Sequence, residues 1–335
     1  MLVTVARGAM IACMLVPLAA RAESIHLKLA YYSSDQTRSY SMAIKPFVDA
    51  INADETGGLA IDAFPGGVLG KDSGQQAHLI RDGLADIAYV VLGTAPDQFG
   101  DHAVMELPGL FRDMREATWV NSRVVASGLI QGYEDFFVIA SLATEPEGIH
   151  TRVPIASLDD LRGKRIRANN AIEASALARL GMSAVVLPIV KTPEAINHGT
   201  IDGAATALGP LTDFGLGRAV TYHYFLRLGP SVRSLLMNRA KFDSLPKAGQ
   251  DAIRRYSRDW VTDRFVAADE AYNKGFIEQL KSDPLRHVIF PSQPELDVAE
   301  ESFKAVRAEW ADASPHHRLL LSAVEAEIAK YRSDR

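Results

Sequence analysis

The chain has 335 residues, of which 47% are hydrophobic, 23% charged and 8% aromatic, a composition typical of globular proteins that are too long for one small core. Its 36 basic and 41 acidic residues give a net charge of −5, and no basic block could neutralise a row of phosphates, so we expect no nucleic-acid partner. Beyond the N-terminal segment, charged residues interrupt every apolar run before the roughly 18 residues that a membrane-spanning helix needs.

The N-terminal segment has the features of a secretory signal. Arg7 precedes an apolar stretch from Gly8 to Ala20, and the segment ends with the small-x-small sequence Ala20-Arg21-Ala22. These features predict an exported protein in which residues 1–22 form a signal peptide that is cleaved before Glu23.

Removal of this segment changes the composition of the mature chain. It takes away two arginines and no acidic residue, so the net charge becomes −7. It also takes away Cys13, the only cysteine of the sequence. We therefore expect neither disulfides nor thiolate metal sites in the mature protein, which must be held together by burial of its core.

Strands and helices alternate through the first half of the mature chain. Segments that alternate apolar and polar residues, or that are apolar throughout, predict strands, and apolar residues at helical spacing predict helices. In chain order these are a strand at Ile25–Tyr31, a helix at Ser39–Ile51, a strand at Leu59–Phe64, a helix at Gln75–Arg81, a strand at Ile87–Leu92, a helix at Arg115–Ile130 and a strand at Phe136–Leu142. Strands that alternate with helices imply a largely parallel sheet.

A second α/β lobe is predicted to begin near Gly148. In chain order, the later elements are a capped turn at Ser157–Leu161, a strand that starts at Arg165–Arg167, a helix at Ile172–Leu180, strands at Ala184–Leu187 and Leu235–Asn238, an uninterrupted helix at Lys247–Leu280, a strand at Arg286–Phe290, and helices at Glu295–Trp310 and Arg318–Tyr331. At 1.5 Å per residue the helix at Lys247–Leu280 would span roughly 45–50 Å, enough to bridge both lobes. No low-complexity linker separates the lobes, so the chain should cross between them several times, which favours hinge closure.

The motifs of exported hydrolases do not occur in the sequence. There is no G-x-S-x-G nucleophile elbow and no H-E-x-x-H pair, and Ser73 lies in a Gly-rich loop that is typical of a turn. We therefore expect no catalytic residue, no metal ion and no cofactor.

One segment carries a candidate binding residue. In the predicted strand, Arg165 and Arg167 share one face while Ile166 takes the other. An arginine at the end of a strand that faces a cleft suits a carboxylate, because its guanidinium donates two parallel hydrogen bonds. The alternative is that both arginines are solvated surface groups.

Six segments together resemble the solute-binding proteins of tripartite ATP-independent periplasmic (TRAP) transporters, the DctP-type family. They occur in the family's order over most of the mature chain, at Leu27–Ala30, Phe64–Gly70, Arg81–Ala88, Glu106–Asp113, Asp159–Arg167 and Gly199–Gly203. The resemblance implies an α/β, two-lobed periplasmic binding protein fold with an interlobe cleft, strands exchanged between the lobes and a long helix that spans both. We expect lobe I to contain residues 23–147 and about 233–272, and lobe II residues 148–232 and about 273–335.

The resemblance also implies a function. It predicts a monomeric, non-enzymatic periplasmic protein that captures a small organic acid and delivers it to the integral-membrane permease subunits of a TRAP transporter. It makes Arg167 the residue that pairs with the ligand's carboxylate. The family usually has an Asn shortly after the Asp-Gly pair, at about the position of Thr206 here, and Asn169 and Asn170 are alternative donors.

Three further positions bear on the ligand. Tyr32, Val91 and Ile189 are aromatic or apolar where sugar-acid-binding relatives have polar residues, so a hydroxyl-rich acid would be left with unpaired polar atoms. No second cation is obvious in the matching segments, so we expect a monocarboxylate, either an aromatic acid or a branched or keto acid. Alternatively, Ile189 and its neighbour Val190 are simply core residues.

Two other functions remain open from the sequence. An exported hydrolase or lyase could use the same cleft, with Arg167 orienting a substrate and Asp35 or Glu145 acting as the base. The chain could also be the binding subunit of another importer or of a sensor system that binds a C4-dicarboxylate.

Overall fold

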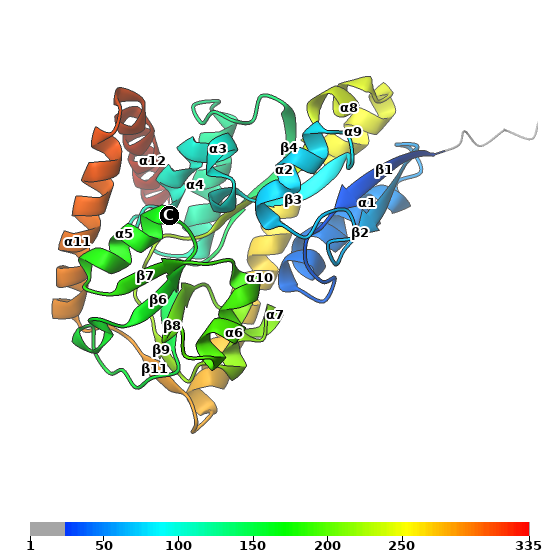
Figure 1. The fold of residues 1–335 in the computed structure, drawn as a ribbon. Coiled ribbons are helices and arrows are strands. Elements are labelled where there is room, and N and C mark those ends of the chain that lie inside the picture. The colour runs from blue at the N-terminus through cyan, green and yellow to red at the C-terminus, as the bar shows by residue number, and fades with distance from the viewer. Residues whose placement is uncertain (1–23, 335) are drawn as a thin grey trace, which may run out of the picture.

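Two β-sheets with helices packed against them form the two lobes of the protein (Figure 1). The computed structural model describes residues 24–334, so the expected signal peptide and its cleavage site lie outside the described residues. Within residues 24–334, no helix combines the length and the apolar character that crossing a bilayer requires. The predicted α/β, two-lobed architecture is confirmed.

The first sheet is built mainly from the N-terminal half of the chain. Its strand order is β2-β1-β3-β10-β4, with bounds Leu59–Phe64, Ile25–Ala30, Ile87–Val91, Val232–Asn238 and Phe136–Ala143. β10 runs antiparallel to both β3 and β4, whereas β1 pairs parallel with β2 and with β3. The helices associated with this sheet are α1 (Lys45–Ala53), α2 (Gln76–Arg81), α3 (Pro96–Phe99), α4 (Met114–Ala126), α8 (Arg239–Ser244) and α9 (Lys247–Arg255). All of β3 is buried, as expected of an apolar strand in the middle of a covered sheet.

The second sheet is built from the middle of the chain. Its strand order is β11-β9-β5-β8-β6-β7, with bounds His287–Ile289, Tyr222–Tyr224, Gly148–Thr151, Gly203–Thr206, Arg165–Ala168 and Ser183–Val186. β5 runs antiparallel to both of its neighbours, and the other pairs are parallel. The helices in this part of the chain are α5 (Ala171–Arg179), α6 (Thr192–Asn197) and α7 (Gly209–Asp213).

Two short segments, 144–147 and 225–231, carry the chain between the sheets and lie against each other. The backbone N–H of Thr144 donates to Ser231 O at 3.0 Å, and the N–H of Leu228 donates to Glu147 O at 3.1 Å. A Cβ atom at Gly229 would lie only 1.8 Å from Glu106 O, so only glycine allows this close approach of two backbones. β10 therefore returns to the first sheet, which confirms the predicted exchange of strands between the lobes.

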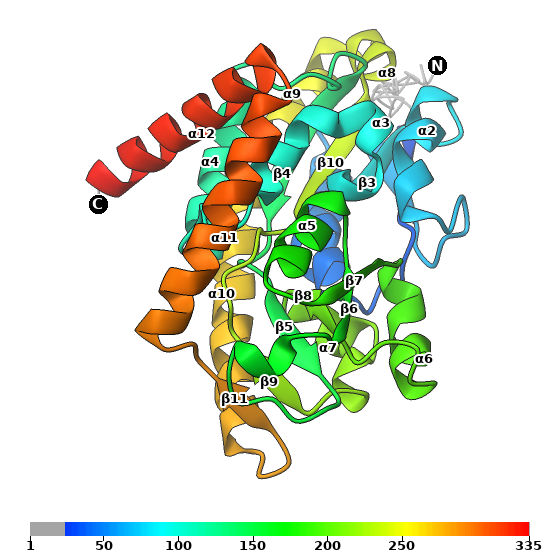
Figure 2. The ribbon, with the colours of Figure 1, turned by 60° about the vertical axis from the view of Figure 1, so that its left-hand side comes forward.

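The prediction of one uninterrupted helix at Lys247–Leu280 is wrong. The chain forms α9, then turns, and restarts as α10 (Asp259–Ser282). The break lies at Arg258, which has φ +54° and whose N–H donates to Ile139 O at 2.6 Å. Ile139 is the extra residue of a β-bulge in β4, so its carbonyl is free to accept this bond. α10 contacts β4 of the first sheet and β11 of the second, which confirms that a long helix bridges both lobes (Figure 2).

The two predicted C-terminal helices are present as α11 (Gln293–Asp312) and α12 (Pro315–Ser333). α11 packs on α5 of the second lobe, and α12 packs on α4 and on the 3-10 helix Gly100–Glu106 (η4) of the first lobe. The C-terminal part of the chain therefore adds a further connection between the lobes.

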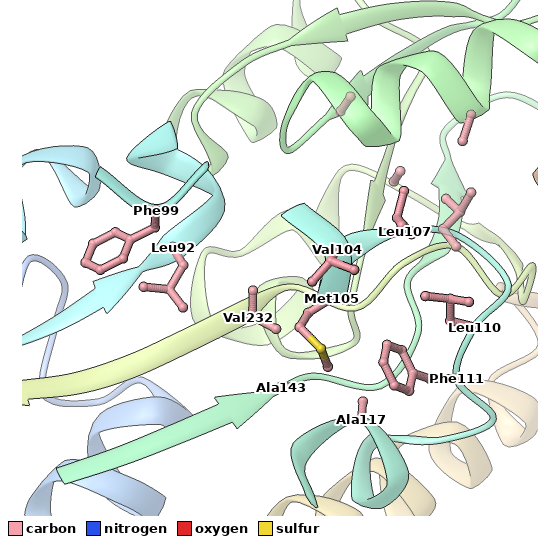
Figure 3. Packing of buried hydrophobic residues seen from close by; sticks show 14 of the residues in the cluster. Leu92, Phe99, Val104, Met105, Leu107, Leu110, Phe111, Ala117, Ala143 and Val232 are labelled. Carbon is pink, nitrogen blue, oxygen red and sulfur yellow. The ribbon is translucent and has the colours of Figure 1, made fainter. Parts of the chain in front are cut away.

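One continuous core passes through the junction of the lobes. Figure 3 shows this region, where Val104 and Met105 of η4 lie beside Val232 at the start of β10. The same cluster of buried residues includes Ile166 and Leu177 of the second lobe. Side chains of this kind bury apolar area without needing polar partners, so the junction is held by packing as well as by hydrogen bonds.

Candidate functional site

The directions of the strands bring several predicted site residues to one edge of the first sheet. β1, β3 and β4 all end at this edge, and the antiparallel β10 begins there. The edge therefore carries Tyr32 after β1, Val91 at the end of β3, Thr144 after β4 and Arg233 near the start of β10. In α/β proteins, ligands characteristically bind beyond the carboxyl ends of parallel strands.

A narrow cavity lies between this edge and helices α7 and α10, and its space of about 30 Å³ has room for no more than one or two water molecules. Its aromatic lining residues are Tyr31, Tyr32, Phe214 and Phe265, and its charged lining residues are Arg38, Asp213, Arg233 and Asp269. The two sheets contribute to it together, since Thr144 and Ala207 also line it. Its lining combines aromatic surface with charge, which suits a small organic ion, but at this volume the lobes must separate further before such an ion can enter.

The tyrosines after β1 form the aromatic wall of the cavity. The rings of Tyr31 and Tyr32 have centroids 5.3 Å apart, and the rings of Tyr31 and Tyr89 are 5.6 Å apart. Burial raises the pKa of Tyr32 to about 12. Its phenol is therefore protonated at neutral pH and can donate a hydrogen bond as well as cover an apolar group.

Arg233 is a residue that the sequence analysis did not select. It lies directly opposite Val91 in the β10–β3 pair, so the two side chains share one face of the sheet. It lines the cavity, and no carboxylate of residues 24–334 lies within 4.0 Å of its guanidinium. The sequence did not indicate Arg233 as a site residue, because it reaches the cavity only after β10, from a distant part of the sequence, joins the first sheet.

Arg38, the other arginine of the cavity, has carboxylate partners, although its buried Nε has no hydrogen-bond acceptor among residues 24–334. Its backbone N–H donates to Asp213 Oδ2 at 3.1 Å, and its Nη1 lies 3.0 Å from Asp269 Oδ1 and 2.9 Å from Asn273 Oδ1. A Cβ atom at Gly209 would lie 2.1 Å from Arg38 Nη2. Arg38 of the first lobe is thus bound both to α7 of the second lobe and to α10.

Glu145 was considered as the general base of an enzyme. In the structure it connects the segment before α7 with helix α10 through hydrogen bonds. Its Oε1 accepts from the Leu208 N–H at 2.5 Å, and its Oε2 accepts from Asn273 Nδ2 at 3.0 Å. Asp35, the other candidate base, lies exposed in the loop after β1, where its Oδ1 accepts from Gln36 Nε2 at 3.1 Å. Asp35 Oδ1 also accepts from the hydroxyl of the adjacent Ser34 at 3.4 Å, a long bond within an exposed turn.

Arg167 lies buried at the end of β6, with 3% of its surface exposed. Its Nε donates to Leu187 O at 2.8 Å, its Nη1 to Ala205 O at 3.1 Å and its Nη2 to Asn169 Oδ1 at 2.9 Å. These bonds use three of its five N–H groups, and burial lowers its pKa. Arg167 does not line this cavity, although Ala207 beyond the neighbouring strand does.

Its neighbour on the same strand face, Arg165, is bound differently. Arg165 Nη2 lies 2.8 Å from Asp202 Oδ1, and its side chain is 43% exposed. The structure therefore separates the two arginines that the sequence placed on one face, because Arg165 has a carboxylate partner and Arg167 has none within 4.0 Å among residues 24–334.

Three buried glutamates, which the sequence analysis also missed, surround the end of β6. Asn170 caps α5 by accepting from the Glu173 N–H at 2.9 Å, and its Nδ2 donates to Glu106 Oε2 at 2.6 Å. Burial raises the pKa of Glu106 to about 8. Burial and the adjacent Glu173 also raise the pKa of Glu147, which lies within electrostatic range of both Arg167 and Arg233.

Thr206, the residue at the usual Asn position, is fixed by a pair of buried histidines. His150 Nε2 lies 3.2 Å from Thr206 O, and His150 Nδ1 lies 2.9 Å from His223 Nδ1. Because a carbonyl can only accept, His150 carries its proton on Nε2 and accepts from the Nδ1–H of His223. Burial lowers the pKa values of these histidines to about 4 and about 2, so both are neutral near neutral pH.

The remaining predicted site residues are less closely associated with the cavity. Val91 is buried at 7% exposure, and Ile189 is partly buried against a cluster that contains Leu208 and Leu211. Val190 is 61% exposed. Among residues 24–334 there is no group of acidic, histidine or cysteine side chains arranged to hold a metal ion.

Comparisons with known proteins agree with this architecture. The model of a family described as bacterial extracellular solute-binding protein, family 7 (DctP), matches residues 29–313. A solute-binding protein of Albidiferax ferrireducens is 24% identical over 221 residues, which cover 63% of this chain and 63% of that relative. The match thus spans less than two thirds of that relative's length.

Solved structures are similar over nearly the whole chain. A TRAP solute-binding protein from Rhodoferax ferrireducens, solved with copurified benzoate, has a TM-score of 0.83 at 22% identity and covers 92% of this chain and 99% of its own. A marine metagenome TRAP solute-binding protein, solved with 3-hydroxybenzoate, has a TM-score of 0.84 at 22% identity with the same coverage. At this level of identity, the likeness establishes the fold.

Proposed function

Because the chain belongs to family 7 of the bacterial extracellular solute-binding proteins, we propose that it captures an organic acid in the periplasm and closes its two lobes around it. It then delivers the acid to the membrane subunits of a TRAP transporter. Export by the signal peptide at residues 1–22 places the protein in that compartment. We propose that one lobe comprises residues 23–147 with about 233–272, and the other residues 148–232 with about 273–335, which include α12 although that helix packs on α4 and η4 of the first lobe.

One observation carries this proposal: a cavity at the facing edges of the two sheets combines four aromatic side chains with a guanidinium that has no carboxylate partner. The aromatic surface suits an apolar or aromatic body, and the cation suits an acid. We place the ligand's carboxylate within reach of Arg167, whose two unused N–H groups are held in fixed directions by its three bonds to protein acceptors. In this proposal Tyr32 and Val91 contact the ligand from the first lobe. Asn169, Asn170, Ile189 and Thr206 contact it from the second lobe.

The ligand class follows from the same surfaces. An aromatic monocarboxylate is supported by the tyrosine and phenylalanine lining, and two similar structures were solved with benzoate and 3-hydroxybenzoate. A sugar acid would leave several hydroxyl groups against these rings without partners, each at a cost of about 1–3 kcal/mol.

A thermal-shift panel tests the proposal. Benzoate, 3-hydroxybenzoate, mandelate and branched keto acids are compared with succinate, malate and sialic acid. Since a ligand that binds only the folded state stabilises it by about 2.7 kcal/mol at 100 times Kd, the cognate acid should raise the melting temperature by several degrees. A shift with succinate, malate or sialic acid alone would contradict the ligand class.

The same sample distinguishes a binding protein from an enzyme. The bound acid should be recovered chemically unchanged after prolonged incubation, at one equivalent per chain. Product that accumulates over many turnovers would show that the cleft performs chemistry.

A further inference from the structure

We propose that Arg233 contacts the ligand's acidic group directly, from the first-lobe side of the cavity, and so makes the site selective for anions. This inference rests on the proposed function, because it requires an organic acid in this cavity. It adds a second cation, supplied by a strand that belongs to none of the segments from which the site was predicted. The expectation that no second cation would lie at the site is therefore wrong, and the preference for an aromatic monocarboxylate rests on the aromatic lining alone.

The position of Arg233 in the sheet directs its side chain toward the cavity. It is the second residue of β10, which starts at the edge where β1, β3 and β4 end. Its partner in the register is Val91, and two residues further along the same face, Leu235 lies opposite Tyr89. Arg233, Tyr89 and Val91 therefore share one face, and Arg233 reaches the cavity lining.

The cation at Arg233 lacks a protein counterion. Glu106, Glu147, Asp213 and Asp269 are within its electrostatic range, but none of these carboxylates lies within 4.0 Å of its guanidinium. Asp269 Oδ1 is already 3.0 Å from Arg38 Nη1, Asp213 Oδ2 accepts from the Arg38 N–H, and burial raises the pKa of Glu106 to about 8. Glu147 is 3% exposed, and burial beside Glu173 raises its pKa, so its charge is suppressed. A partly buried guanidinium without a counterion is costly, and an anionic ligand would remove that cost.

A second donor beside Arg233 also lacks an acceptor. Tyr89 is fully buried, and its hydroxyl lies close to Ser39 and Arg233 without a hydrogen bond of good geometry to either. The Tyr32 phenol is protonated because burial raises its pKa to about 12. Arg233 and Tyr32 both line the cavity, and the unpartnered Tyr89 hydroxyl lies beside Arg233, so a carboxylate bound there would offer acceptors to neighbouring donors.

Arg38 does not compete for this role. Its guanidinium is bound by Asp269 and Asn273 and lies 4.2 Å from the centre of the Tyr272 ring, so its charge is compensated. Of the two arginines in the cavity lining, Arg233 is the one that has no carboxylate within 4.0 Å among residues 24–334. Phe214 and Phe265 offer apolar surface for the rest of an aromatic acid.

The test compares an acid with its uncharged amide. Dissociation constants for benzoate and benzamide, and for 3-hydroxybenzoate and its amide, are measured by calorimetry on the wild type and on Arg233→Met. Since hydrogen bonds to charged groups are worth about 1.5–3 kcal/mol, Arg233→Met should weaken the acids at least about tenfold. The amides should change by less than about threefold, so the preference for the acid should collapse.

Two further variants keep the test independent of folding. Arg239→Met is the matched control, because Arg239 directly follows β10 at the end remote from the cavity, and it should leave all four constants unchanged. Arg233→Lys keeps the charge but loses the planar fork, so it should bind the acids more weakly while retaining the preference over the amides.

The outcomes separate the inference from the proposed function. Equal losses for acid and amide in Arg233→Met, or no loss for either, would overturn the role of Arg233 while the wild type still binds acids. Failure of the wild type to bind any acid of the thermal-shift panel would overturn the proposed function and this inference together.

Discussion

Arg167 and Arg233 stand at facing edges of the two sheets, and the protein holds them in different ways. Arg167 is 3% exposed and donates to Leu187 O, Ala205 O and Asn169 Oδ1. Arg233 is only partly buried, lines the cavity and has no carboxylate within 4.0 Å among residues 24–334. The second lobe thus presents an arginine held by three hydrogen bonds, whereas the first lobe presents an arginine without a counterion. A ligand that binds both arginines would stabilise the closed arrangement of the lobes.

The largest effect is expected from removing the arginine of the second lobe. Arg167→Ala should weaken binding of the cognate acid at least about tenfold to a hundredfold, because charge-assisted hydrogen bonds contribute roughly 1.5–3 kcal/mol or more. Calorimetry measures the change. Arg165→Ala is the matched control, since Arg165 shares the strand face but is bound to Asp202, and its loss should leave the affinity within about threefold. An unchanged affinity in Arg167→Ala would remove Arg167 from the site.

The contacts that join the two edges should control closure. Asp213→Ala removes the acceptor of the Arg38 N–H and a carboxylate 4.0 Å from its guanidinium, so the ligand-free protein should be more open. Small-angle scattering should give a larger radius of gyration, and affinity should fall by roughly three- to tenfold because closure then costs more. Asp35→Ala is the control, because Asp35 is an exposed residue in the turn that precedes Arg38. A compact Asp213→Ala variant would show that this contact does not hold the lobes.

The comparison of the edges also shows what the sequence could predict. The local patterns were sufficient for β1, β2, β3 and β4, and the Arg165–Arg167 strand was recognised because its apolar and charged residues alternate. Arg233 was missed because it reaches the cavity only when β10 inserts antiparallel between β3 and β4. The pairing of β10 with β3 connects residues more than a hundred positions apart, so no local sequence pattern indicates it.

The break in the long helix had the same kind of cause. Residues 247–280 carry a continuous helical pattern, but the N–H of Arg258 bonds to Ile139 O of a bulge in β4. A tertiary contact therefore overrides local propensity at that position. The buried glutamates were missed for a related reason: Glu106, Glu147 and Glu173 come from three separate segments that meet only at the junction of the lobes.

A smaller effect, on stability, is expected from the carboxyl group that links the edges. Burial, together with the nearby Glu173 of α5, raises the pKa of Glu106 from 4.5 to about 8, although the Val232 N–H and Arg233 of β10 oppose the shift. The folded state thus binds a proton that the unfolded state releases, so stability should be full below about pH 4.5 and fall as pH rises through about 8. The loss should amount to a few kcal/mol at about 1.4 kcal/mol per pKa unit, reduced by relaxation around the site.

Glu106→Gln should reduce this alkaline loss. The amide keeps an oxygen that can accept from Asn170 Nδ2, but it cannot ionise. Urea unfolding between about pH 6 and pH 9 measures how steeply the free energy of unfolding falls with pH. Glu325→Gln, on the exposed side of α12, is the control. An equally steep decline in Glu106→Gln and the wild type would show that Glu106 does not cause it.

The smallest effect on stability should come from His150 and His223, the histidine pair next to Thr206. It should appear as a loss of stability at acid pH, whereas Glu106 causes a loss at alkaline pH. Burial lowers the pKa of His150 from 6.5 to about 4 and that of His223 to about 2, so the unfolded chain binds protons that the folded protein excludes. Their contribution is present above about pH 6.5 and is lost as pH falls toward 4. His223→Asn keeps a donor for His150 Nδ1 and should reduce the decline in melting temperature between about pH 6.5 and pH 4.5, whereas His198→Asn, at an exposed position, should not. Because this pair fixes the Thr206 carbonyl on the second-lobe edge, an unaltered acid profile in His223→Asn would mean that the pair is not the acid-sensitive element of that edge.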